Sequence, residues 1–583
     1  EMRITAIEIE NFKGISERVR VDLKPITLLF GANSAGKSTI LHALLYMKDV
    51  LERRNLDAIT TPVSGRALDL GGFRNFVHGQ DLNRTVRIAL FMDLTGGELP
   101  EMAPTYELPS ALSPAAESRV EQLYRRQSDI LDSIQSAKVE IEVRWNEEAR
   151  KAVSFAYTLG LNGSDLIRIE RESEELKVAK FDWCNAAVSR PPTDEERQLR
   201  SWDLEEDRES TREQQDEPVP SLPDILPRFY KKRSVFLGLK QHWLRKHQDP
   251  IPDFSVIETL NLPESDSDFE QRRGDYEPSD LDYIEIAKMR AWEGTAFLAR
   301  LIFGPGKLVQ DCLQGLRYIG PLRARPPRES TPSGELSDWS EGLAAWKALE
   351  SEGNSSELID QVSEWLAGKD RLNSGYGLER KHLAQVDAGA FQKAVDGDID
   401  RARLLDLLKE APKSTEIKLV ERRTGLRLDP SDVGVGISQV LPIVVGAVVP
   451  GGSLVAIEQP ELHIHPAMQV ALGDLFIEGV KKRGMSFLIE THSEHLMLRL
   501  LRRIREKAGS ELPSELPDFS RDDLSVLYVE RSGAERMEIV SIDIDQTGKF
   551  VSRWPRGFFP ERMHEALPKE IRERVESKWQ GGK

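Results

Sequence analysis

The chain has 583 residues, 39% hydrophobic and 30% charged, which predicts a soluble globular protein with two or more structural units. No stretch approaches the roughly 20 apolar residues that a membrane helix needs, and the first residues lack the apolar core of a signal peptide. Its formal charge of −17 argues against nucleic-acid binding over the whole surface. Two cysteines are too few for a disulfide framework, so we expect a cytoplasmic protein without a membrane partner.

The first part of the chain predicts one buried strand and an antiparallel β layer. Residues 25–30, PITLLF, are short and apolar, as a central buried strand would be. Alternating apolar and polar residues predict further strands. These lie at 3–12, 85–94, 138–145, 151–161 and 166–172. We assign 1–185 to an N-terminal lobe.

The middle of the chain carries no motif. Residues 186–220 are acidic and polar and are flanked by prolines, which is typical of a linker. Residues 221–415 are expected to form a mainly helical insertion. In the last segment, 416–583, two apolar strands each lead into a helix, and 523–544 predicts a β-hairpin.

A phosphate-binding loop follows the apolar strand. GANSAGKS at 31–38 matches G-x-x-x-x-G-K-[ST] and opens a helix, which is the context that the motif requires. Its glycines let backbone N–H groups surround phosphates, Lys37 supplies a positive charge and Ser38 reaches Mg²⁺. The sequence therefore predicts binding of ATP with Mg²⁺. The nucleotide-binding residues are Gly31, Asn33, Ser34, Ala35, Gly36, Lys37, Ser38 and Thr39.

A second strand delivers carboxylates. LVAIEQPELHIHP at 454–466 places Glu458 where an acid contacts Mg²⁺, directly or through water. The next position would ordinarily hold the general base that polarises the attacking water, but here it is Gln459. Glu461 is a carboxylate that could act instead. Either hydrolysis is slow and ATP acts mainly as a clamp, or phosphoryl transfer needs little help from a base; we favour a slow ATPase.

Two further elements complete the pattern. The apolar run FLIETHS ends at His492, which can hydrogen-bond a γ-phosphate. Residues 432–444 form a glycine-rich turn that opens an apolar helix, and such a turn exposes N–H groups to an anion. Its candidate nucleotide contacts are Gly434, Gly436, Ser438 and Gln439. Clustered histidines in 463–495 leave a zinc site as an alternative.

The order of these motifs resembles that of ABC-type ATPases of the SMC/RecF/OLD group. IENFKGI near the start is similar to that group's first strand and turn, and 318–329 and 553–561 are similar to stretches of stand-alone bacterial AAA-like ATPases, some from anti-phage systems such as Septu. The resemblance implies an α/β fold, an ABC-ATPase head with a mixed sheet, an antiparallel layer and the helical insertion. It also implies Lys13 near the nucleotide and Gln80 as a residue that senses Mg²⁺.

The same resemblance implies that two heads meet around ATP, as a homodimer or a larger even-numbered oligomer. A phosphate loop of one copy would face the 434–439 turn of the other. The absence of long heptads argues against an SMC protein. An OLD-like nuclease is the alternative, since Glu530, Asp543 and Asp545 mimic pieces of a Toprim metal site, but only a hairpin separates them.

One segment suits nucleic acid. Residues 229–247 interleave basic side chains with aromatic ones and contain no acid, a combination that serves phosphate contact and base stacking. A solvated helix face with its aromatics in the core is the alternative. The basic residues are Lys231, Lys232, Arg233, Lys240, Arg245 and Lys246. We expect an ATPase that regulates or powers a transaction on DNA or RNA, in phage defence or DNA repair, with a partner effector such as a nuclease, or a nucleotide-gated scaffold.

Overall fold

A computed structural model gives the fold. It describes residues 2–32, 35–53, 55–58, 69–101, 121, 124–125, 127–172, 175–182, 185, 189–190, 219–220, 278–325, 339–351, 356–389, 392, 405–406, 409, 411, 413–532, 536–552 and 554. The chain divides into two compact units: the first comprises 1–22, 42–59 and 69–314, and the second 23–41, 60–68 and 315–583. Each unit therefore combines segments that are far apart in sequence.

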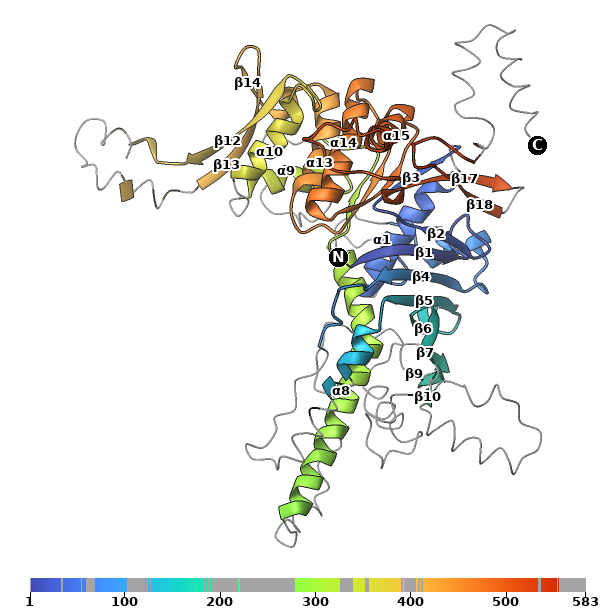
Figure 1. Cartoon of the computed structure of the whole chain (residues 1–583). Helices are drawn as coiled ribbons and strands as arrows, with labels where there is room; N and C mark the ends of the chain where they lie inside the picture. Colours follow the sequence, from blue (N-terminus) through green and yellow to red (C-terminus); the bar gives the residue numbers. More distant parts are fainter. Residues whose placement is uncertain are drawn as a thin grey trace, which may run out of the picture. The chain divides into compact units, whose positions relative to one another are not determined.

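The second unit is built on a six-stranded sheet in the order β11-β15-β16-β3-β17-β18. Of these strands, β3, β17 and β18 are labelled in Figure 1. All neighbours are parallel except the last pair, which is an antiparallel hairpin. The strands are β3 (Ile26–Gly31), β11 (Arg317–Ile319), β15 (Leu454–Glu458), β16 (Ser486–Glu490), β17 (Leu524–Ser532) and β18 (Arg536–Ser541). The phosphate-loop strand β3 thus lies between β16 and β17.

Helices bury the apolar faces of this sheet. Every residue of β3, β15 and β16 is buried, as expected for parallel strands covered on both faces. Phe476 and Phe487 pack with ring centroids 4.9 Å apart in this core. The helices are α9 (Leu343–Glu350), α10 (Ser356–Ala367), α13 (Val435–Val448), α14 (Pro466–Arg483) and α15 (Glu494–Ala508).

The second unit also holds a three-stranded antiparallel sheet, β12-β13-β14. Its strands are β12 (Tyr376–Ala384), β13 (Lys413–Glu421) and β14 (Arg427–Leu428). The segment 221–415, expected to be mainly helical, contains α9, α10 and the long helix α8 (Pro278–Gln314), but also β11 and β12. The alternation of buried and exposed residues along β12 is weak, which explains why its sequence did not predict a strand.

The first unit contains a seven-stranded antiparallel sheet in the order β2-β1-β4-β5-β6-β7-β8. The strands are β1 (Arg3–Glu10), β2 (Val19–Asp22), β4 (Val86–Asp93), β5 (Ser136–Asn146), β6 (Lys151–Leu161), β7 (Ser164–Glu172) and β8 (Glu175–Phe181). Helices α1 (Lys37–Arg53, in this unit from His42 onward), α2 (Phe73–Phe76) and α8 (Pro278–Gln314), and the short pair β9 (Ser189–Arg190) and β10 (Val219–Pro220), complete it.

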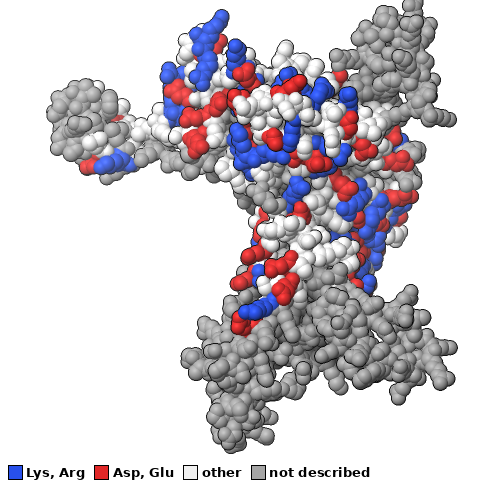
Figure 2. Space-filling view, in the orientation of Figure 1, with Lys and Arg blue, Asp and Glu red and all other residues white. Residues whose placement is uncertain are grey.

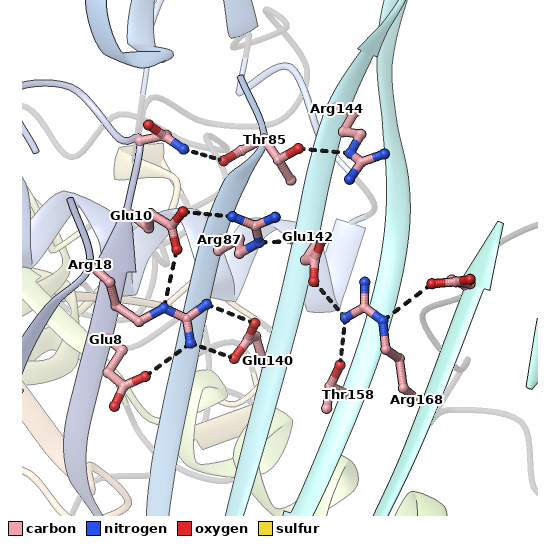
Figure 3. Close-up of polar contacts among 12 residues, drawn as sticks. Glu8, Glu10, Arg18, Thr85, Arg87, Glu140, Glu142, Arg144, Thr158 and Arg168 are labelled. Atoms are coloured by element: carbon pink, nitrogen blue, oxygen red, sulfur yellow. Dashed lines mark hydrogen bonds and ion pairs between the residues drawn. The ribbon is translucent and has the colours of Figure 1, made fainter. Parts of the chain in front are cut away.

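One face of this sheet is apolar and the other is charged. Val139, Ile141 and Val143 of β5 are buried in the core, whereas the alternate residues Glu140 and Glu142 join a network of arginines and glutamates (Figure 3). We call this network the Arg–Glu lattice. Its members are Glu8, Glu10, Arg18, Arg87, Glu140, Glu142, Arg168 and Glu170.

The predicted fold class is confirmed: the protein is α/β, with the phosphate-loop strand in a mixed sheet and a separate antiparallel β layer. The predicted hairpin at 523–544 is also present, but its first strand is not a peripheral element. β17 pairs with β3 from Leu524 to Val529 and is part of the central sheet. Within the part of the chain that the structure describes, no helix is long and apolar enough to cross a membrane.

Candidate functional site

The candidate site lies in the second unit, where three parallel strands end. Gly31 ends β3, Glu458 ends β15 and Glu490 ends β16. Glu458 and Glu490 are directly paired in register, and Glu490 is paired with Leu29. Since parallel strands point their carboxyl ends to the same edge, this edge gathers the phosphate loop and both carboxylates, as ligand sites of open α/β sheets require.

The loop has room only for glycine at two positions. Gly31 has φ +143°, and a Cβ added there would lie 2.1 Å from the Val529 carbonyl oxygen of β17. Gly36 has φ +106°, and its Cβ would lie 2.7 Å from Sδ of Met537. Helix α1 begins directly afterwards, so its first N–H groups face the loop. Ala35 and Thr39 are buried, whereas Asn33 and Ser34 lie outside the described residues.

The Lys37 side chain is buried beneath this loop. Its Nζ donates to the carbonyl oxygens of Gly31 at 3.1 Å and Ala32 at 3.0 Å, and lies 3.6 Å from Oε1 of Glu490. Burial lowers the pKa of the Lys37 ammonium, and the nearby Glu490 carboxylate opposes that effect. The oxygens of a triphosphate are negatively charged and would be stronger partners for the ammonium than these two neutral carbonyl groups.

Ser38 is hydrogen-bonded to a carboxylate that our motif analysis did not assign. Its Oγ donates to Oε2 of Glu490 at 2.6 Å. The FLIETHS motif predicts His492 as a phosphate contact and gives no role to Glu490. A signal was nevertheless present, because an apolar strand ending in glutamate is the same pattern that identified Glu458. The hydroxyl predicted to reach Mg²⁺ therefore lies beside an acid.

The peptide after Glu458 is held in an unusual conformation. Gln459 has φ +44°, a left-handed value that is uncommon for a residue with a side chain. Its N–H donates to the Glu490 carbonyl at 2.8 Å. The buried Arg323 donates through Nη2 to the carbonyl oxygens of Glu458 at 2.6 Å and Gln459 at 3.3 Å. Oε1 of Glu458 accepts from the Tyr318 hydroxyl at 2.8 Å.

Glu461 is engaged by the end of the next strand. Its Oε2 accepts from the Thr491 hydroxyl and its Oε1 accepts from the His492 N–H, both at 2.7 Å. Partial desolvation lowers the pKa of His492, and the positive charge of Lys37 lowers it further. The imidazole is therefore neutral at pH 7 and can donate one hydrogen bond to a phosphate oxygen. Glu461 fixes the backbone from which this ring extends.

The glycine-rich turn differs from the prediction in where its helix begins. Helix α13 starts at Val435, so Ser438 and Gln439 lie inside it and are buried. The Ser438 hydroxyl donates to the Val435 carbonyl at 2.8 Å. The Gln439 amide accepts from the Arg323 N–H at 3.2 Å and donates to the Arg323 carbonyl at 2.6 Å. At this helix end Gly434 and Val435 are exposed. Contact of Ser438 and Gln439 with nucleotide stays a prediction.

Two predicted site residues belong to the first unit. Lys13 has φ +51° and its Nζ lies 2.6 Å from Nδ1 of His42. Burial, together with the Lys13 charge, lowers the pKa of His42 to about 4, so the neutral ring accepts from the ammonium. Gln80 is exposed at the end of the 3-10 turn η1 (His78–Gln80), with φ +56°. Their roles at the nucleotide stay predictions.

Two of the acids of the alternative nuclease site, Asp543 and Asp545, accept hydrogen bonds within the C-terminal turns, and the third, Glu530, lies in the β17–β18 pair. Glu530 of β17 is paired with Glu538 of β18. Asp545 accepts from the N–H groups of Thr547 at 2.7 Å and Lys549 at 3.0 Å, and Asp543 accepts from the Ser552 hydroxyl at 2.9 Å.

The described residues hold no group of three or more His, Cys, Asp or Glu that could bind a metal ion. Mg²⁺ does not require such a cage, because it takes one or two carboxylates together with phosphate and water. Ser38, Glu458 and Glu490 therefore fit a magnesium ion that arrives with a nucleotide.

The basic and aromatic segment 229–247 lies outside the described residues, so the structure says nothing of its six candidate contacts. On the visible faces of the described residues, Lys and Arg are interspersed with Asp and Glu rather than gathered into one large basic area (Figure 2).

Two family models match the chain. One is described as an AAA ATPase domain and matches residues 2–96. The other is described as "AAA domain, putative AbiEii toxin, Type IV TA system" and matches residues 335–498. The first match covers the phosphate loop, and the second covers the glycine-rich turn, Glu458 and His492. No curated protein sequence matches the chain.

Solved Smc head structures are similar over 93% of this chain. The SmcHead bound to the C-winged helix domain of ScpA is 10% identical, with a TM-score of 0.35 and 98% of that chain covered. A Smc head with a coiled coil and joint from Pyrococcus yayanosii is 11% identical, with a TM-score of 0.35 and 98% covered. The SMC head from Thermotoga maritima is 9% identical, with a TM-score of 0.33 and 100% covered.

Proposed function

We propose that this chain is an ABC-type, AAA-like ATPase of the SMC/RecF group, and that it binds ATP with Mg²⁺ at the carboxyl ends of β3, β15 and β16 and hydrolyses it slowly. The observation that carries the proposal is the convergence of the phosphate loop, Lys37 and Ser38 with Glu458 and Glu490 at one sheet edge. These segments are separated by more than 400 residues in the sequence, so their meeting is a property of the fold.

Each residue has a distinct task in this proposal. Lys37 binds β- and γ-phosphate oxygens in place of its present carbonyl partners, and the N–H groups of 31–38 surround the phosphates. Ser38 and Glu458 hold Mg²⁺, which neutralises charge on the phosphates. His492 orients the γ-phosphate as a neutral donor. Gln459 can orient water through its amide but cannot accept its proton, which makes turnover slow.

We further propose that ATP joins two copies of the chain. Gly434 and Val435 are exposed at the N-terminal end of α13, where helix N–H groups favour an anion. In a dimer, this end would contact the γ-phosphate bound by the other copy. The coupled task would be a DNA or RNA transaction with a partner effector such as a nuclease, in phage defence or DNA repair.

Phosphate release and molecular mass test the proposal together. Wild-type protein should release phosphate from ATP, with kcat well below 1 s⁻¹, and its mass should double when ATP is added with Mg²⁺. Lys37→Ala should abolish both effects. A protein that neither binds ATP nor changes mass with it would contradict the proposal.

A nucleotide-gated scaffold is the second candidate, and the engagement of Glu461 favours it. Both oxygens of this carboxylate accept hydrogen bonds from 491–492. Glu461 is therefore not available as the general base, a role that Gln459 cannot fill. ATP-dependent doubling of mass without measurable phosphate release would favour the scaffold. Metal-dependent cutting of plasmid by this chain alone, lost in Asp543→Ala, would instead favour an intrinsic nuclease.

A further inference from the structure

The strand end of β16 carries a carboxylate whose surroundings indicate a task. Glu490 is only 6% exposed, and it lies between Glu458 on β15 and Leu29 on β3. Its Oε2 accepts from the Ser38 hydroxyl at 2.6 Å, and its Oε1 lies 3.6 Å from the Lys37 ammonium. Both oxygens are thus directed at the phosphate loop, toward the two side chains that the nucleotide and its metal ion require.

Glu461, the other carboxylate near Gln459, has a different environment. Its oxygens accept from Thr491 and from the His492 N–H, so it fastens the end of β16 to the turn after β15. Moving it toward a nucleotide would leave the Thr491 hydroxyl, on a fully buried residue, without this acceptor. No comparable cost applies to Glu490, because Mg²⁺ would replace the proton donors that it now has.

We propose that Glu490 is a second carboxylate of the magnesium site. Without nucleotide it holds Ser38 and Lys37 in place; with Mg²⁺–ATP, Ser38 and Lys37 turn to the metal and phosphates, and Glu490 accepts hydrogen bonds from water on the metal. Such an arrangement matches the preference of Mg²⁺ for few carboxylates and retained water. This inference rests on the proposed function, since it concerns how the same site binds the metal.

The inference has a measurable consequence for binding. Glu490 and Glu458 together repel a triphosphate that arrives without a cation, because the repulsion between like charges is strong where burial lowers the effective dielectric constant. ATP alone should therefore bind much more weakly than ATP with Mg²⁺. Removing the Glu490 charge should tighten binding of ATP alone and weaken the benefit of Mg²⁺.

Titration with a fluorescent ATP analogue, in Mg²⁺ and in EDTA, tests this. The quantity of interest is the ratio of Kd in EDTA to Kd in Mg²⁺. We expect Glu490→Gln to lower this ratio about tenfold, equivalent to about 1.4 kcal/mol. Glu379→Gln is the control for the loss of one carboxylate, because Glu379 lies on β12 of the separate three-stranded sheet and pairs with Arg427. It should leave the ratio within about twofold of wild type.

The outcomes separate this inference from the proposed function. An unchanged ratio in Glu490→Gln, with tight binding to wild type, would overturn the role of Glu490 alone. Failure of wild type to bind the analogue at all would overturn the proposed function. If Glu490→Gln does not fold, Glu490→Asp is the second variant, because it keeps the charge but shortens the side chain by one methylene. It should lower the ratio of the two Kd values at least threefold. A ratio equal to that of wild type in Glu490→Asp would also overturn the inference.

Discussion

The Arg–Glu lattice and the nucleotide site use glutamate in opposite ways. In the lattice, carboxylates meet guanidinium groups: Glu142 of β5 lies 2.6 Å from Arg168 of β7 and 3.4 Å from Arg87 of β4 (Figure 3). At the site, the ammonium of Lys37 lies 3.6 Å from Glu490, and the charges of Glu458 and Glu461 also act on it. Arg323, the other buried cation near these carboxylates, donates to backbone carbonyl groups. Paired opposite charges stabilise the sheet, whereas an excess of carboxylates near the phosphate loop favours binding of a cation.

Removing the positive charge of Lys37 should have the largest effect, and the property affected is ATP binding. Lys37→Ala is expected to weaken ATP binding at least 100-fold, about 2.7 kcal/mol, since the buried ammonium is the main protein charge facing the phosphates. Equilibrium binding of the fluorescent analogue measures it. Lys24→Ala is the control, because Lys24 precedes the same strand, is exposed and donates to the Arg521 carbonyl. Equal loss in both variants would contradict the assignment.

Breaking the lattice should cost stability instead. Arg168→Met removes a partner from Glu142, whose side chain is only 4% exposed, and should lower the free energy of unfolding by about 2 kcal/mol. Urea unfolding monitored by fluorescence measures this. The double variant Arg168→Met with Glu142→Leu should recover most of the loss, because no unbalanced carboxylate is then buried.

Glu458→Gln provides the matched comparison at the site. It should change the free energy of unfolding by less than about 1 kcal/mol, because Tyr318 can still donate to the amide oxygen. A loss as large as that of Arg168→Met would remove the distinction between the two regions.

Restoring a base at position 459 should sharpen the account of slow turnover. Gln459→Glu is expected to raise kcat for ATP hydrolysis about tenfold, a modest share of what a well-placed general base contributes. Phosphate release under saturating ATP measures it. The same substitution combined with Lys37→Ala should show no activity. A kcat equal to that of wild type would mean that the glutamine does not limit hydrolysis.

Acid should weaken the lattice by the smallest amount. Burial raises the pKa of Glu142, but Arg168 and Arg87 outweigh it, so the pKa lies below its ordinary value of 4.5. The unfolded chain then binds the proton more readily, and the stabilisation present above about pH 4.5 is lost as pH falls further. In urea unfolding experiments, the free energy of unfolding should fall by about 1 kcal/mol more in wild type than in the Arg168→Met, Glu142→Leu variant as the pH is lowered from 6 to 3.

Much of this architecture follows from local sequence. Strong alternation predicted β1 and β4 to β7, and uniform apolar runs predicted β3, β15 and β16. The phosphate loop and Glu458 were identified because motif and flanking elements agree. Neighbours in space were not predictable from such patterns: nothing local indicates that β17 pairs with β3, that Glu490 meets Ser38, or that Gln439 turns inward to Arg323. These contacts depend on strand order, which only the whole fold determines.

The placement of β3 has a consequence for synthesis of the protein. Its two neighbours, β16 and β17, are translated more than 450 residues after it. At about 5–20 residues per second, an emerging β3 has no pairing partner for on the order of half a minute. Until then this largely apolar strand, buried throughout in the folded protein, is exposed to aggregation or to a chaperone, and the phosphate loop lacks Glu458 and Glu490. Nucleotide binding would therefore report that the C-terminal segment has been made and has folded.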